Sequence, residues 1–313
     1  MPQHRHISRL AVLLTLWVGC VAARAATIDG VDTPPVIVYT TIGFAGPNRP
    51  DHQQIGRGAA WHGYPAVLRR ELGPAIARGA DRLQVQLPYG TPTVKPMSFT
   101  AGPILDGSWW RIQRADPALT RLSITSYTDA WRAIRKEAGR PLTVTHYLGA
   151  ITLDPVMVGA KADPSAWLWW ATNAVRGLDQ PGDQVGLDAS DQIVEGSAEH
   201  RFVQLLDALG VTPIIEPAPT AEHLLDYDCL ALVRLLGDDQ TLNGAYLDLV
   251  ARERKGEPLP RGEVRVMVQG RVGGWPRDRW ESLVREIVGR GHVPMIERAH
   301  LDWWVELWRE GGK

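Results

Sequence analysis

The chain has 313 residues, of which 44% are hydrophobic and 22% charged, and its formal net charge is −1. This composition is typical of a soluble globular protein with one large domain or two ordinary ones. The near-balance of charge, without a cluster of Lys and Arg, argues against a nucleic-acid partner.

The first 25 residues have the pattern of an export signal. A basic head over residues 4–9 precedes a short apolar run over 10–21, and Ala23-Arg24-Ala25 matches a small-x-small cleavage site. We therefore expect a signal peptide over 1–25 and a secreted or periplasmic mature protein. The alternative is a lipoprotein signal with lipidated Cys20, the one membrane attachment that the sequence suggests. Without Cys20, Cys229 is the single remaining cysteine, so we expect no intramolecular disulfide.

After a lead-in over 26–35, short apolar runs alternate with longer amphipathic segments. The apolar runs predict strands at 36–44, 82–90, 142–150, 183–190, 211–217, 229–236, 263–270 and 292–297. The amphipathic segments predict helices at 61–78, 128–138, 164–177, 198–210, 220–227, 240–254, 276–291 and 299–310. Each expected strand precedes one expected helix, which makes eight strand–helix units.

Eight such units predict the α/β class and a (β/α)8 TIM barrel, formed by a single domain over 36–313. Turns from helix to strand are short, whereas the loops after several strands are long, as at 45–60, 91–125 and 148–163. Long loops at one end are typical of a barrel with one functional face. The structural alternative is an open, doubly wound sheet. No G-x-G-x-x-G follows the first strand, so we expect no dinucleotide and no other cofactor.

Carboxylates follow two consecutive expected strands. Asp188 and Asp191 close the stretch "QVGLDASDQI", and Glu216 closes "VTPIIEP". Neighbouring strands in a sheet lie about 4.8 Å apart, and glycoside hydrolysis uses two carboxylates roughly 5–10 Å apart. We therefore expect Glu216 to act as general acid and Asp188 as nucleophile or base. Asp191 competes with Asp188, or caps the following helix.

Other polar and aromatic residues near the expected strand ends are candidates for substrate binding. Tryptophan combines a flat apolar face with an N–H donor, which suits a sugar ring, and the chain has 13 Trp. The expected binding residues are Tyr39, Tyr89, Trp109, Trp110, His146, Tyr147, Gln269, Arg271, Trp275 and Glu297. The expected partner is an oligo- or polysaccharide, and we expect a monomer.

Two other functions remain open. His146, Asp188, Glu216 and Glu297 together would suit a divalent metal in a metal-dependent isomerase or hydrolase. No H-x-H or H-E-x-x-H accompanies them, so the main interpretation has no metal. The second alternative is a carbohydrate-binding barrel without catalysis.

The arrangement over 36–310 resembles that of the secreted (β/α)8-barrel glycoside hydrolases. The features that carry the resemblance are the eight units, the acids in "GLDASD" and "IIEP", and the tryptophans of the expected mouth loops. The largest group of these enzymes has an Asn-Glu pair after strand four and a nucleophilic Glu after strand seven. This chain has "LDASD" and "MVQG" there, so Gln269 cannot be that nucleophile. The resemblance therefore implies a hydrolase of glycosidic bonds with a differently arranged catalytic pair.

Overall fold

A computed structural model of the chain describes residues 25–41, 64–86, 129–147, 183–188, 193–236, 241–269 and 275–310. Eight parallel strands in these ranges form a closed barrel, because β8 pairs with β10 and β11 pairs with β3. The predicted closed barrel is confirmed, and the open sheet is wrong. The barrel strands are β3 (Ile37–Thr41), β4 (Arg82–Gln86), β5 (Thr143–Tyr147), β6 (Gln184–Asp188), β7 (Thr212–Glu216), β8 (Asp228–Leu236), β10 (Val264–Gln269) and β11 (Val293–Glu297).

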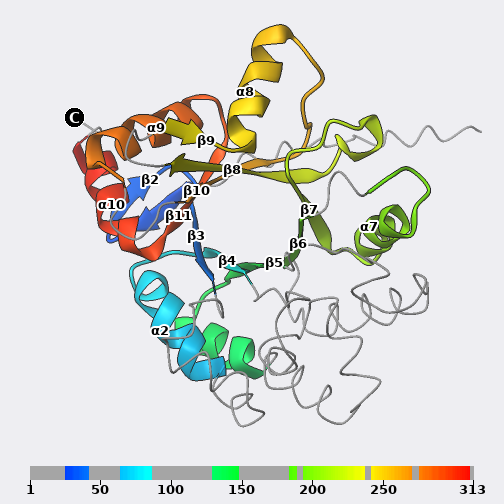
Figure 1. Cartoon of the computed structure of the whole chain (residues 1–313). Coiled ribbons are helices and arrows are strands. Elements are labelled where there is room, and N and C mark those ends of the chain that lie inside the picture. The colour runs from blue at the N-terminus through cyan, green and yellow to red at the C-terminus, as the bar shows by residue number, and fades with distance from the viewer. Residues whose placement is uncertain are drawn as a thin grey trace, which may run out of the picture.

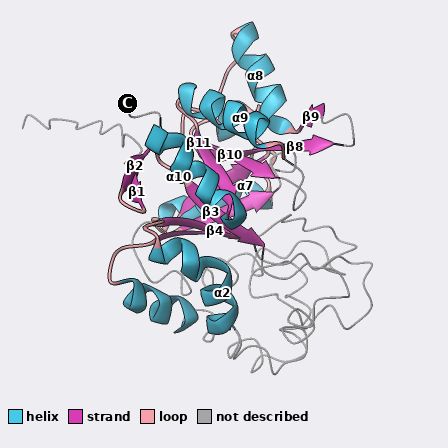
Figure 2. Ribbon diagram, turned by 90° about the vertical axis from the view of Figure 1, so that its left-hand side faces the viewer, coloured by secondary structure: helices cyan, strands magenta, loops and turns pink. Residues whose placement is uncertain are grey.

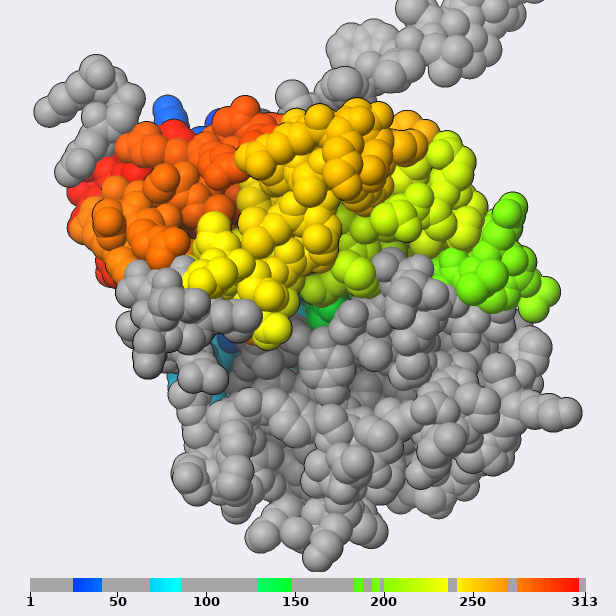
Figure 3. Space-filling view, turned by 45° about the horizontal axis from the view of Figure 1, so that its top comes forward, coloured from blue at the N-terminus to red at the C-terminus, as the bar shows by residue number. Residues whose placement is uncertain are grey.

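Helices lie outside the ring of strands, as Figure 1 and Figure 2 show from two directions. Residues 129–138 are helical and precede β5. On the face shown in Figure 3, the described residues from 241 to 310, coloured yellow to red, lie together. The other helices are α2 (Tyr64–Ala77), α7 (Ala198–Ala208), α8 (Ala245–Lys255), α9 (Arg277–Gly289) and α10 (Leu301–Glu310). No helix in the described ranges is long and apolar enough to cross a membrane.

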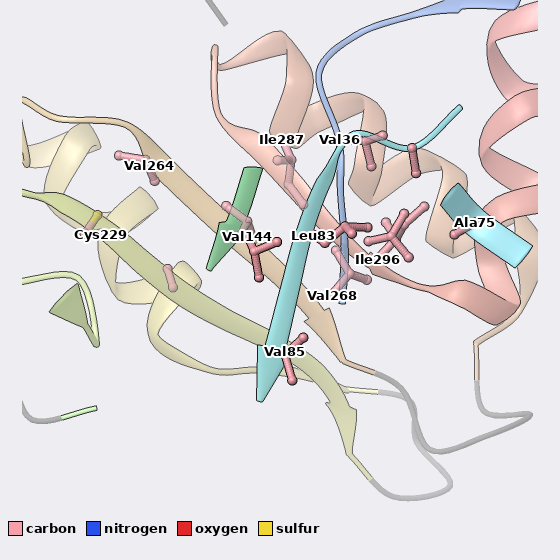
Figure 4. Packing of buried hydrophobic residues seen from close by; sticks show 14 of the residues in the cluster. Val36, Ala75, Leu83, Val85, Val144, Cys229, Val264, Val268, Ile287 and Ile296 are labelled. Atoms are coloured by element: carbon pink, nitrogen blue, oxygen red, sulfur yellow. The ribbon is translucent and has the colours of Figure 1, made fainter. Parts of the chain in front are cut away.

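Successive residues of each barrel strand point to opposite faces, and the core is therefore divided in two. The larger cluster lies between strands and helices and includes Val38 of β3 together with Trp131 and Trp304 of the helices. Figure 4 shows part of this packing. The smaller cluster fills the inside of the barrel and includes Ile37 and Tyr39 of the same strand β3. Cys229 belongs to the outer cluster, and burial raises the pKa of its thiol to about 12.

The N-terminal half of the barrel interior contains charged side chains. The Arg265 guanidinium is fully buried and donates hydrogen bonds to Thr145 Oγ1 (2.9 Å), Glu263 Oε1 (2.8 Å) and Asp228 Oδ2 (3.4 Å). Arg82 adds a second ion pair to Glu263 at 2.5 Å. Burial raises the pKa of Asp228, whereas Arg265 and Arg82 outweigh burial at Glu263 and lower its pKa. The charges thus compensate each other inside the barrel.

The lead-in expected at 26–35 contains a small hairpin, β1 (Ala26–Ile28) and β2 (Val31–Thr33). Its turn, Asp29-Gly30, has positive φ at both residues, as a tight two-residue turn requires. The hairpin contacts the turn after α2, where the Arg78 guanidinium forms ion pairs with Asp29 (2.6 Å) and Asp302 (2.7 Å). The lead-in is therefore part of the folded domain.

Two expected helices differ from the structure. Between β7 and β8 the chain forms only the 3₁₀ turn η3 (Glu222–Leu224) instead of a helix over 220–227. Two prolines, Pro217 and Pro219, precede this short connection, and a proline restricts the residue before it to extended backbone. Strand β9 (Thr241–Asn243) pairs antiparallel with the end of β8, so α8 begins only at Ala245. A second 3₁₀ turn, η4 (Arg298–His300), leads into α10. The expected helix at 164–177 lies outside the described residues.

Candidate active site

The C-terminal ends of β6 and β7 bring the two predicted catalytic positions side by side. Asp188 and Glu216 are register partners, each the last residue of its strand. Parallel pairing therefore places their backbones at neighbouring positions on one edge of the barrel. The side chain of Asp188 and the whole of Asp191 lie outside the described part of the chain. The adjacency of Asp188 and Glu216 thus rests on strand register.

The Glu216 carboxyl is mostly buried and, among the described residues, accepts a hydrogen bond from a side chain two strands away in the barrel. The Tyr147 hydroxyl, at the end of β5, donates to Oε2 of Glu216. Burial raises the pKa of Glu216 from 4.5 to about 8, because a charged carboxylate loses its hydration there. Glu216 consequently holds a proton at neutral pH, which is the state that a general acid requires.

A second tyrosine–glutamate pair lies at the same end of the barrel. Tyr39 of β3 and Glu297 of β11 are register partners, and the Tyr39 hydroxyl donates to Glu297 Oε1 at 3.0 Å. Burial, together with the neighbouring Glu297, raises the pKa of Tyr39 well above 10. Tyr39 therefore remains a protonated hydrogen-bond donor at neutral pH.

His146 does not lie with these residues. Because it immediately precedes Tyr147 in β5, strand alternation directs it to the helix-facing side. Its side chain is 1% exposed, with Nε2 3.6 Å from Asp183 Oδ2 and the ring in edge contact with Trp131. His146 and Arg135 outweigh burial at Asp183 and lower the pKa of that carboxyl. His146 thus lies on the helix-facing side of its strand and not at the barrel mouth where we expected it.

Trp275 also differs from its expected place at the mouth. It is 5% exposed and packs in the outer hydrophobic cluster, next to the start of α9. A short connection from β10 to α9 carries this apolar ring into the strand–helix layer, where burial is favourable. Gln269 ends β10, is partly exposed and pairs in register with Arg234 of β8. Four further predicted binding residues lie outside the described ranges: Tyr89, Trp109, Trp110 and Arg271.

The described residues contain no group of three or more His, Cys, Asp or Glu side chains suited to a metal ion. The four residues considered for a divalent metal were His146, Asp188, Glu216 and Glu297. His146 faces away from the barrel interior, where Tyr147 lies. The described geometry therefore does not assemble that set.

Sequence reasoning missed Gly186 and the buried ion pairs. A Cβ built on Gly186 would lie 2.4 Å from Cδ2 of Tyr147, so only glycine leaves room for that ring. The signal for the ion pairs was the alternation of polar and apolar residues in "RLQVQ" and "EVRVMVQ". A barrel strand with polar residues at every second position directs them inward, since the outer face packs against helices.

No family model and no curated protein matches this chain. The class that the fold defines is a closed, parallel α/β barrel, with polar and acidic residues at the C-terminal ends of its strands. In enzymes of this architecture, the C-terminal end of the barrel is where active sites occur.

Proposed function

We propose that this chain is a (β/α)8-barrel hydrolase of glycosidic bonds, with Glu216 as general acid and Asp188 as the second carboxylate. The observation that carries the proposal is the register pairing of Asp188 with Glu216, where burial keeps Glu216 protonated. Two neighbouring carboxyl groups, one protonated and one ionised, supply the acid and the nucleophile or base that glycoside hydrolysis needs.

In this mechanism Glu216 donates its proton to the glycosidic oxygen as the bond from that oxygen to the anomeric carbon breaks. Asp188 either attacks the anomeric carbon or removes a proton from the attacking water. In this proposal Tyr39 and Glu297, which are paired at the same end of the barrel, bind sugar hydroxyls. The proposed substrate is an oligo- or polysaccharide, and the leader over residues 1–25 is proposed to direct an exported, monomeric enzyme.

The proposal is tested by reducing-end release from a panel of glycans, with wild type, Glu216→Gln and Asp188→Asn. The matched control is Glu195→Gln, which changes an exposed glutamate in the turn before α7. We expect both site variants to lose at least about 100-fold in kcat/KM and the control to keep full activity. A dinitrophenyl glycoside needs no protonation of its leaving group, so Glu216→Gln should retain kcat/KM on that substrate while Asp188→Asn should not.

The pH profile provides a second test. Activity should fall as pH rises through about 8, because Glu216 then loses the proton that it donates. Glycan binding without hydrolysis by wild type would overturn the proposal in favour of a carbohydrate-binding barrel. Activity that depends on a metal found in the purified protein would instead favour the metal-dependent alternative.

A further inference from the structure

The Tyr147 side chain spans three adjacent strands. It starts at the end of β5, passes over Gly186 of β6 and reaches Glu216 at the end of β7. Tyr147 and Gly186 are register partners, and Gly186 is in turn paired with Ile214 of β7. The ring is 1% exposed and belongs to the cluster inside the barrel. A side chain this enclosed has little freedom to contact a substrate with its ring faces.

Gly186 makes this path possible. It lies within a regular strand, so the requirement is for space and not for an unusual backbone angle. An added Cβ would lie 2.4 Å from Tyr147 Cδ2, closer than atoms in contact can approach, and 3.2 Å from Cγ, which is tighter than most contacts. Any residue other than glycine would therefore displace the ring and remove its hydroxyl from Glu216.

The hydrogen bond acts differently on the two forms of Glu216. Oε2 accepts from the Tyr147 hydroxyl, which leaves the other oxygen to carry a proton. After the proton has left, the same donor stabilises the buried negative charge, and hydrogen bonds to charged groups are the stronger ones. The tyrosine therefore fixes the orientation of the carboxyl and eases its ionisation.

We propose that Tyr147 is a positioning residue that holds the Glu216 carboxyl in one orientation, and that Gly186 is required because it leaves room for the tyrosine ring. This assignment replaces the substrate-binding role expected for Tyr147. Its catalytic meaning rests on the function proposed above, whereas the contact itself can be tested without any substrate.

The test is ¹³C NMR of the full chain labelled at the glutamate side-chain carboxyl carbons, titrated with pH. Glu216→Gln identifies the Glu216 signal by its disappearance, and the wild-type midpoint should lie at about 8. Tyr147→Phe removes only the hydroxyl and should raise the midpoint by on the order of one pH unit, because the carboxylate loses a donor. The matched control is Tyr39→Phe, which removes the hydroxyl from the Tyr39–Glu297 pair and should leave the Glu216 midpoint unchanged.

The Gly186→Ala variant tests the same contact from the neighbouring strand, β6. This variant should also raise the Glu216 midpoint. The double variant with Tyr147→Phe should have a midpoint close to that of either single variant. Circular dichroism confirms that each variant is folded. If Tyr147→Phe does not fold, the midpoint of Gly186→Ala alone tests the contact between Tyr147 and Glu216. An unchanged midpoint in a folded Tyr147→Phe or Gly186→Ala variant, or an equal change in Tyr39→Phe, would overturn the proposal.

The outcome of this titration can be distinguished from the outcome of the glycan-cleavage test of the proposed function. If the midpoint moves as expected but no glycan is cleaved, Tyr147 still positions Glu216 and the glycosidase proposal fails. If wild type cleaves glycans, the high-pH limit of kcat in Tyr147→Phe should move upward with the NMR midpoint, while KM changes little. A cleaving enzyme whose high-pH limit stays fixed in Tyr147→Phe would overturn the positioning role alone.

Discussion

Glu216 should make the stability of the fold depend on pH in a direction opposite to that of an ordinary surface carboxylate. Burial raises its pKa to about 8, against 4.5 for an exposed glutamate. Between these two values the folded state binds a proton that the unfolded state releases. The stabilisation is therefore fully present below about pH 4.5, declines as pH rises, and is lost above about pH 8.

The magnitude follows from the difference between the two pKa values. About 3.5 pH units at roughly 1.4 kcal/mol each correspond to about 5 kcal/mol of unfolding free energy. Because the Glu216 side chain keeps partial contact with solvent, we expect a measured change of about 3–5 kcal/mol. Glu216→Gln cannot ionise and should not show this decline.

The assay is urea unfolding of wild type and Glu216→Gln at intervals between pH 5 and pH 9. We expect the stability of the variant relative to wild type to increase from pH 5 to about pH 8 and then to level off. Glu195→Gln, whose side chain is exposed, serves as the control for general effects of charge removal. A difference between wild type and Glu216→Gln that stays constant from pH 5 to pH 9 would refute the argument that burial keeps this carboxyl protonated.

Three further substitutions test the packing of the barrel by urea unfolding. Arg265→Met should cost about 3 kcal/mol, because it leaves Glu263 with less compensation for its charge; a cost under about 1 kcal/mol would contradict this. Gly79→Ala should cost about 2 kcal/mol, since φ is +115° and the new Cβ would lie 2.2 Å from the Thr27 carbonyl oxygen; unchanged stability would contradict it. Gln84→Met should gain about 1 kcal/mol, because neither polar atom of this fully buried amide has a hydrogen-bond partner in the structure as described; a loss of stability would show that the amide is satisfied in solution.

The number of strands and their positions along the chain could be predicted from the sequence because both depend on local patterns. A run such as "EVRVMVQG" has the length and β-branched content of a strand, and β10 occupies Val264–Gln269 within it. Closure could be expected only from the count of units, since no local feature specifies the pairing of β11, the last barrel strand, with β3, the first. The connection between β7 and β8 was predicted wrongly, because a periodic apolar pattern of a few residues does not ensure a stable helix.

The site was predictable to the level of strand ends but not of side-chain direction. The positions of Asp188 and Glu216 follow from where their strands stop, and the register makes them neighbours. His146 and Tyr147 were both expected at the mouth, yet adjacent residues of one strand face opposite sides. Gly186 left no signal that could be recognised from one sequence, because its role depends on a ring contributed by another strand.

The two halves of the barrel interior differ in what they can offer to a ligand. In the N-terminal half, Arg265 is already hydrogen-bonded to Thr145, Glu263 and Asp228, and breaking these contacts would leave buried charges uncompensated. In the C-terminal half, the carboxyl groups of Glu297 and Glu216 accept hydrogen bonds from the hydroxyls of Tyr39 and Tyr147, respectively. The N-terminal half therefore serves stability, and the function proposed above assigns substrate binding to the other end, where Glu216 and Glu297 complete their strands.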